Sequence, residues 1–145
     1  MALEMLVNID VDDLERAVAF YRNAFDLEVG RRLGDGVVEL LGASSRLYLL
    51  AKPAGSAAAA GTAQTRTYRR HWTPVHLDMV VLDVEVAVRR AVEAGARLEG
   101  GTRSHAWGRI AQLADPFGHG FCLIEFTNRG YDEIAVGQTQ GYPAP

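Results

Sequence analysis

Hydrophobic and polar residues alternate along residues 4–10 and again along residues 75–81. Such period-two alternation predicts half-buried strands with one apolar and one polar face. Apolar residues at three- and four-residue spacing follow each stretch, which predicts helices with one buried stripe, the first from about residue 13. We expect Asp12 to cap this first helix and Gly95 to end the second.

The chain repeats itself at a distance of seventy residues. Residues 6–24 align with residues 76–94, but Leu6 stands where the second copy has His76. Three strand signals follow each helix, at about 27–33, 36–41 and 46–51 in the first half and at about 97–100, 106–114 and 120–126 in the second. This order predicts an α+β fold of two tandem βαβββ modules.

These signals divide the chain into four segments within one compact domain. They are a first module (1–52), an Ala/Gly-rich linker (53–73), a second module (74–126) and a C-terminal tail (127–145). The linker is low in complexity, which favours an exposed loop. Each helix is expected to cover one face of its own sheet. The other, more polar faces would then curve together into a cup-like groove, where a ligand site is expected.

Composition limits the classes of protein that remain. The chain has 145 residues, 48% of them hydrophobic, and a net charge of −3, which is typical of a globular protein and not of a nucleic-acid-binding one. No apolar run is long enough to cross a membrane, and no segment resembles a signal peptide. With Cys122 as the only cysteine, no disulfide can form within the chain. A reducing compartment, and hence the cytoplasm, is predicted.

Several side chains on the expected groove faces could contact a ligand. His76 and Asp78 share a strand face and could act as a hydrogen-bonding pair. Glu39 and Arg109 coincide under the seventy-residue shift; they either pair across the groove or contact a polar ligand, or they point outward into solvent. The full set of predicted groove residues is Asn8, Glu39, Tyr48, His76, Asp78, Trp107, Arg109 and Cys122.

Two of these residues carry specific interpretations. Arg109 is the preferred candidate for binding a carboxylate or phosphate, and Trp107 is expected to line a pocket beside it. For Cys122 the favoured interpretation is a small buried hydrophobic residue, because no basic residue in its own strand would activate the thiol.

Three segments resemble the vicinal-oxygen-chelate superfamily, which includes glyoxalase I, extradiol dioxygenases, fosfomycin-resistance transferases and bleomycin-resistance proteins. They are VDDLERAVAFYRNAFDLEVG (11–30), AVEAGARLEGG (91–101) and ADPFGHGFCLIEF (114–126). The resemblance implies paired βαβββ modules that form a cup, commonly in a dimer. It also implies that the enzymes of the group bind a divalent metal at the cup floor.

The resemblance places the metal ligands on the first and last strands of each module. In this sequence the four positions fall on Leu6, Tyr48, His76 and Cys122. Leucine cannot coordinate a metal, and only His76 is a good ligand, whereas a tight site needs about three or four. The predicted metal site is therefore incomplete, with His76 as its one assigned ligand and Zn, Fe, Mn or Ni as the candidate ions.

The leading functional prediction is a homodimer that binds a small anionic or polar-aromatic molecule in its groove, with no nucleic-acid or membrane partner. One alternative is a metal-dependent lyase or dioxygenase that uses His76 as a ligand. Another is a structural or interaction module without catalysis. No catalytic residue is assigned.

Overall fold

Residues 2–137 are described by the computed structural model, so part of the predicted tail lies outside the described residues. The helices are α1 (Leu14–Phe25) and α2 (Val84–Ala94). The strands are β1 (Val7–Val11), β2 (Glu28–Leu33), β3 (Val37–Leu41), β4 (Leu47–Ala51), β5 (Leu77–Val80), β6 (Arg97–Leu98), β7 (Arg103–His105), β8 (Gly108–Ala114) and β9 (Gly120–Phe126). A short 3₁₀ helix, η1, covers Gly130–Glu133. Within residues 2–137, no helix is long and apolar enough to span a membrane.

The strands form two sheets of matching topology. The first has the order β1-β4-β3-β2, and the second has the order β5-β9-β8-β6 with β7 also paired to β8. In each sheet the first strand of the module runs parallel to the last, and the remaining pairs are antiparallel. The predicted α+β fold of two tandem βαβββ modules is confirmed.

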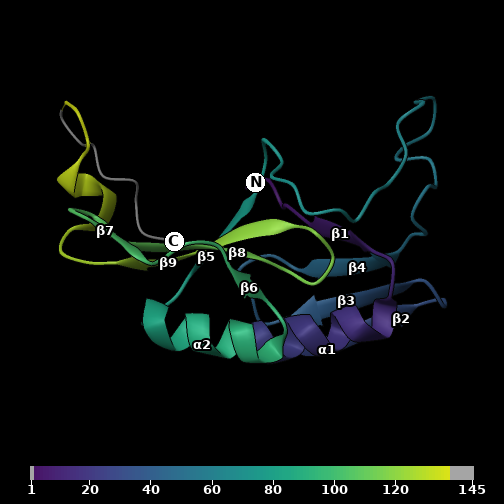
Figure 1. Ribbon diagram of the computed structural model, residues 1–145, viewed down its shortest axis with the longest axis horizontal. Coiled ribbons are helices and arrows are strands. Elements are labelled where there is room, and N and C mark those ends of the chain that lie inside the picture. Colours follow the sequence, from purple (N-terminus) through teal and green to yellow (C-terminus); the bar gives the residue numbers. More distant parts are fainter. Residues whose placement is uncertain (1, 138–145) are drawn as a thin grey trace.

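Both helices lie in one row on the same side of the two sheets (Figure 1). Their apolar stripes pack against the sheets, with Phe20 of α1 and Val84 of α2 fully buried. The predicted cap Asp12 is wrong by one position, because the extended backbone that a cap requires occurs at Asp13, whose side chain accepts from the Arg16 N–H. Gly95 ends α2 with a φ of 122°, as predicted.

One buried carboxyl joins the two modules. The Tyr21 hydroxyl of α1 donates to Asp115 Oδ2 at 2.5 Å, and both side chains are buried. Asp115 Oδ1 also accepts from the backbone N–H groups of Phe117 and His119, which close the turn between β8 and β9. The first module's helix is thereby fixed to the second module's last turn.

The second module contains a strand that the sequence pattern does not predict. The expected strand at 106–114 begins only at Gly108, and β7 precedes it after a two-residue turn. A Cβ at Gly108 would collide with the Glu125 carbonyl group, and the φ of Gly108 is +156°. The hairpin between β7 and β8 therefore depends on a glycine that allows β9 to approach closely.

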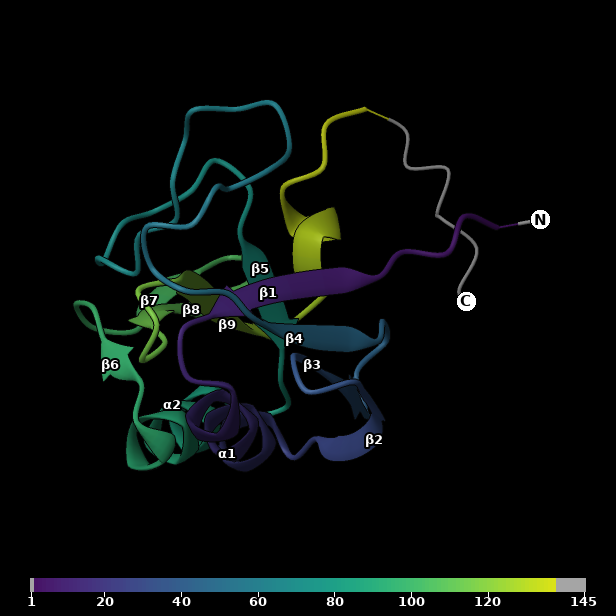
Figure 2. The same cartoon turned by 90° about the vertical axis from the view of Figure 1, so that its right-hand side faces the viewer.

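The segment expected to be an exposed linker is largely exposed, as predicted, but it is anchored to the first sheet. It rises from the side opposite the helices, as Figure 2 also shows. The Arg66 side chain pairs with Asp10 of β1 at 2.7 Å and donates to Ser56 and to the Ala57 and Ala58 carbonyls of its own loop. An arginine that the composition places in a solvated loop thus anchors that loop to the first sheet.

We predict that Tyr21→Phe lowers the free energy of unfolding by about 2 kcal/mol. The change removes one buried hydrogen bond to a carboxyl group and leaves the ring packing intact. Urea denaturation measures the effect. Tyr131→Phe is the matched control because Tyr131 is half exposed, and its loss should stay below about 0.5 kcal/mol. Equal effects of the two changes would contradict a special role for the bond to Asp115.

Candidate functional site

Each sheet has one face that packs on its helix and one that faces away from it, which we call the open face. On β8, Ala111 and Leu113 belong to the buried core, so Ile110 and Gln112 face the other way. Across the sheet, Gln112 pairs with Cys122 of β9. The structure therefore brings the predicted residues on β5 and β9 to the open face of the second sheet.

Three predicted residues form a cluster on this open face. Asp78 and Cys122 are register partners on β5 and β9, and His76 Nε2 lies 3.3 Å from Asp78 Oδ1. One donor atom from each of His76, Asp78 and Cys122 lies within 4.8 Å of the others. The His76 and Asp78 side chains are each 39% exposed, whereas Cys122 is buried. The cluster thus has a buried sulfur beneath an accessible imidazole and carboxylate.

The environment of Cys122 keeps it a thiol. Burial raises the pKa of Cys122 to about 11, and the neighbouring Asp78 adds to this rise through its charge and its hydrogen bond. At neutral pH the sulfur is therefore protonated and weakly nucleophilic. This arrangement supports the interpretation that Cys122 is not an activated nucleophile.

Trp72, which is not among the predicted groove residues, lies beside this cluster. The Trp72 ring meets the His76 ring edge-on at 5.6 Å and lies over Gly120, where any side chain would collide with it. The Arg70 guanidinium stacks on Trp72 at 4.6 Å and forms an ion pair with Glu99 at 2.5 Å. The run Arg70-His71-Trp72 is the signal that could have indicated a fixed aromatic wall.

Two arginines reach the open face of the second sheet from its outer strands. Arg103 of β7 pairs with Ile110, and Arg97 of β6 pairs with Ala114, both of which face away from α2. Arg103 is close enough that its charge acts on the Cys122 thiol. Among the described residues, neither arginine forms an ion pair. They give this face a positive rim.

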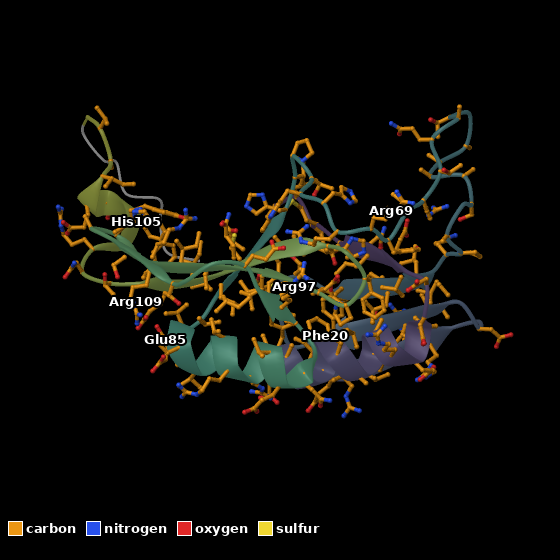
Figure 3. The ribbon with its side chains drawn as sticks, viewed as in Figure 1. Phe20, Arg69, Glu85, Arg97, His105 and Arg109 are labelled. Atoms are coloured by element: carbon orange, nitrogen blue, oxygen red, sulfur yellow. The ribbon has the colours of Figure 1, made fainter. Side chains whose placement is uncertain are left out.

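Arg109 does not join the other predicted groove residues. It has the same orientation as Ala111 and Leu113, toward the helix side, and it forms ion pairs with Glu85 of α2 and Glu125 of β9. Figure 3 shows Arg109 and Glu85 side by side at the start of α2. The expected pairing of Arg109 with Glu39 across the groove is therefore wrong, because the two side chains lie on opposite faces of their sheets.

On the open face of the first sheet, a buried ion pair lies at the position that corresponds to the cluster on the second sheet. Glu39 is 3% exposed and accepts from Arg31 at 2.6 Å and from the Tyr48 hydroxyl at 2.8 Å. These two donors, Arg31 first, lower the pKa of Glu39 to about 2. Gly30 makes room for the carboxylate, since a Cβ there would lie 2.6 Å from Glu39 Oε1. Nothing in the sequence pattern indicates Arg31 as the partner of this carboxylate.

The remaining predicted residues lie apart from the cluster. Asn8, the register partner of Tyr48, lines a cleft of about 470 Å³ between the edges of β1 and β5. Trp107 stacks on His105 with ring centres 5.0 Å apart and also contacts the ring of Tyr131. Leu6, which aligns with His76 in the sequence repeat, is 52% exposed. The structure therefore separates the eight predicted residues into several groups.

Comparison with known proteins identifies the family. Residues 6–124 match the model of the glyoxalase-like domain. An uncharacterized protein of Mycobacterium bovis is 35% identical over 119 residues, which cover 78% of this chain and 76% of that protein. The chain belongs to the glyoxalase-like family, within the vicinal-oxygen-chelate superfamily.

Two further proteins are similar to this chain over different extents. The anthracycline biosynthesis protein DnrV of Streptomyces peucetius is 37% identical over 86 residues, which cover 57% of this chain and 30% of DnrV. A mutant of the fosfomycin resistance protein FosX of Listeria monocytogenes, solved in complex with Mn(II) and a dihydroxypropylphosphonic acid, superposes with a TM-score of 0.63. Its identity is 22%, covering 86% of this chain and 90% of FosX. The FosX likeness shows the shared fold alone.

The donor atoms of this chain provide only part of a metal site. Of the four positions that the superfamily resemblance implies, Leu6 offers no donor and the Tyr48 hydroxyl is committed to Glu39. His76 and Cys122 remain, and the structure adds Asp78 beside them. A nitrogen, an oxygen and a sulfur donor on one sheet fit a small tetrahedral ion with one position left open.

We predict that the stabilising effect of Glu39 depends on pH. Its pKa is lower in the folded protein than in the unfolded chain, so its contribution is complete above about pH 5 and declines as the pH falls toward 2. The difference in Tm between the wild type and Glu39→Gln should therefore shrink over that interval. Glu4→Gln removes an exposed ion pair with Arg46 and serves as the control, with little change at any pH. A Glu39 effect that is constant from pH 2 to 7 would be inconsistent with the buried ion pair.

Proposed function

We propose that this protein binds a small polar-aromatic or anionic molecule on the open face of its second sheet. The observation that carries the proposal is the combination of an aromatic wall, Trp72, with two arginines, Arg97 and Arg103, that form no ion pair with the described residues and lie on the sheet face opposite the helices. The lone cysteine is compatible with a reducing compartment, so we place the protein in the cytoplasm.

The chemistry of this face suits such a ligand. Ile110 and Ile124 are register partners that supply an apolar floor, while Trp72 offers a ring for offset or edge contacts. Arginine guanidinium groups bind carboxylates and other anions in a bidentate manner and also stack on aromatic surfaces. A planar ring system with an anionic substituent would use both kinds of contact at once.

The similarity to DnrV supports the aromatic part of this proposal. DnrV is named for anthracycline biosynthesis, and anthracyclines are built on planar fused rings. The alignment covers less than a third of DnrV, so the similarity suggests a class of ligand and not an activity.

We also propose that the protein forms a homodimer through the open faces. Val80 of β5 is 63% exposed, and Leu6 and Phe126 are also accessible on this side of the molecule. The loop at 52–73 and η1 both rise from this side and bound the sheets at either end (Figure 1). A second copy placed between them would cover apolar surface and form the other wall of the groove.

The ligand proposal is tested with anthraquinone-2-sulfonate, a planar aromatic anion, in the presence of a chelator. We expect binding to quench the fluorescence of Trp72, one of only two tryptophans. Arg103→Gln should weaken binding about tenfold, because it removes a hydrogen bond to a charged group worth about 1.5 kcal/mol. Trp72→Leu should weaken it roughly threefold to tenfold.

Arg109→Gln is the matched control, since it removes the same charge from the helix-facing side of the sheet. Its affinity should equal that of the wild type. If Arg109→Gln lost binding and Arg103→Gln bound as tightly as the wild type, the ligand site would not be on the open face of the second sheet. A lack of binding by the wild type to this probe and to simple aromatic carboxylates would favour the structural or interaction module.

Sedimentation velocity tests the dimer. We expect a particle of twice the 15.8 kDa chain mass, and Val80→Asp should convert it to monomer by placing a charge in the interface. Val92→Asp, which changes a half-exposed residue of α2, should leave the mass unchanged. A wild-type monomer at micromolar concentration would contradict the proposal.

The second candidate function is a metal-dependent lyase or dioxygenase with His76 as a ligand. The proximity of donor atoms from His76, Asp78 and Cys122 is the observation that favours it. The two candidates differ in whether the bound molecule is changed, and turnover that stops in chelator and returns with one added metal would favour the enzyme.

A further inference from the structure

We propose that His76, Asp78 and Cys122 form a metal site within the second module alone, and that this site selects thiophilic ions such as Zn²⁺ and Co²⁺ over Mn²⁺ and Mg²⁺. The inference deepens the proposed function, since the site lies on the same open face and its free position faces the proposed ligand. It differs from the four-position arrangement implied by the superfamily resemblance, because Asp78 supplies a donor that the first module does not.

The geometry is close to that of a tetrahedral site. The donor atoms lie within 4.8 Å of one another, and the His76 and Asp78 donors are 3.3 Å apart. Zinc with bonds of about 2.0 Å to nitrogen or oxygen and about 2.3 Å to sulfur holds its donors roughly 3.3–3.8 Å apart. The donor atoms that lie farthest apart must therefore approach each other by about 1.0–1.5 Å. His76 and Asp78 are partly exposed and can make that adjustment by rotation of their side chains.

The backbone fixes the relation between the three donors. His76 and Asp78 are two residues apart, so their side chains leave the same side of the chain, and Cys122 is held opposite Asp78 by the pairing of β5 with β9. The Trp72 ring, on which the Arg70 guanidinium stacks, lies edge-on to the His76 ring and forms one side of the cluster. A site on paired strands needs little ordering when the ion binds.

The sulfur determines which ion is bound. A thiolate is a soft ligand that favours zinc, cobalt and similar ions, whereas Mn²⁺ and Mg²⁺ favour oxygen ligands. Cys122 is the only cysteine of the chain, and its thiol must lose a proton when the ion binds. With three protein donors, the fourth position remains open to water or to an oxygen of the bound molecule.

The test uses tag-free, full-length protein that has been freed of metal and then titrated with CoCl₂. We expect one Co²⁺ per chain and thiolate-to-cobalt charge-transfer absorption in the near ultraviolet. Cys122→Ser should abolish that absorption. In competition with a chromophoric chelator, His76→Gln and Asp78→Asn should each weaken Zn²⁺ binding at least tenfold. Even the loss of a residue that only hydrogen-bonds to a metal ligand weakens binding by about this factor.

His105→Gln is the matched control, because His105 is an exposed histidine of the same sheet outside the cluster, and its affinity for Zn²⁺ should be unchanged. Mn²⁺ should not displace Co²⁺ at equal concentration. Circular dichroism of each variant confirms that it is folded. The absence of thiolate-to-cobalt absorption in the folded wild type would overturn the inference, and so would equal binding of Mn²⁺ and Zn²⁺.

The two proposals can fail separately. Binding of anthraquinone-2-sulfonate in chelator without any Co²⁺ site would overturn the metal inference and leave the proposed function standing. A Co²⁺ site with the expected variant effects, in a protein that binds no aromatic anion with or without Zn²⁺, would support the metal inference and overturn the proposed function.

Discussion

The alternation of side chains along each strand, with a helix on one side of each sheet only, decides what a residue of this protein can contact. A residue that points toward the helix enters the core or pairs at its rim, and a residue that points away reaches the open face. Arg109 and Arg103 illustrate the rule, because they lie on neighbouring strands and have opposite orientations. Arg109 pairs with Glu85 of the helix, whereas Arg103 lies near the Cys122 thiol. Arg103 and Arg109 occupy adjacent register positions, and this one-residue offset makes Arg109 part of a structural ion pair and Arg103 a candidate binding residue.

The open faces of the two sheets are formed by corresponding strands of the repeat, but their side chains differ in chemistry. In the first module the row across the sheet is Asn8, Tyr48 and Glu39, and the guanidinium of Arg31 neutralises the one carboxylate in it. In the second module the corresponding row begins with Asp78 and Cys122, and among the described residues no arginine or lysine pairs with that carboxylate. Since a buried charge is costly without a partner, the first face is closed by its own ion pair. The open face of the second sheet retains donor atoms without such a partner. For this reason the proposed small-molecule ligand and the proposed metal ion are both assigned to the second module.

The fold was largely predictable because the repeat, the alternation and the helical stripes all indicate the same architecture. The seventy-residue shift correctly relates Asn8 to Asp78, but the registers relate Tyr48 to Cys122 at a shift of seventy-four. Three of the four extra residues precede Gln112 of β8, in the stretch that contains β7 and its turn, and the fourth lies between β8 and β9. A constant shift therefore assigns Arg109 as the partner of Glu39, although the observed pairing across the sheet relates Gln112 to that position. Local patterns predict which face a residue occupies within one strand, but they do not report an insertion between strands.

Contacts between distant segments were the other part that the sequence could not predict. Arg66 and Trp72 belong to a stretch whose composition indicates a solvated loop, yet both are fixed by partners from the two modules. Trp72 can lie against the second sheet only because Gly120 has no side chain, and Arg70 holds it there through Glu99. The same tryptophan contacts the His76 ring, whose Nε2 atom also lies beside the Asp78 carboxylate. The segment between the modules therefore supplies a wall of the candidate site as well as a connection, and it does so beside the cluster of donor atoms on the second sheet.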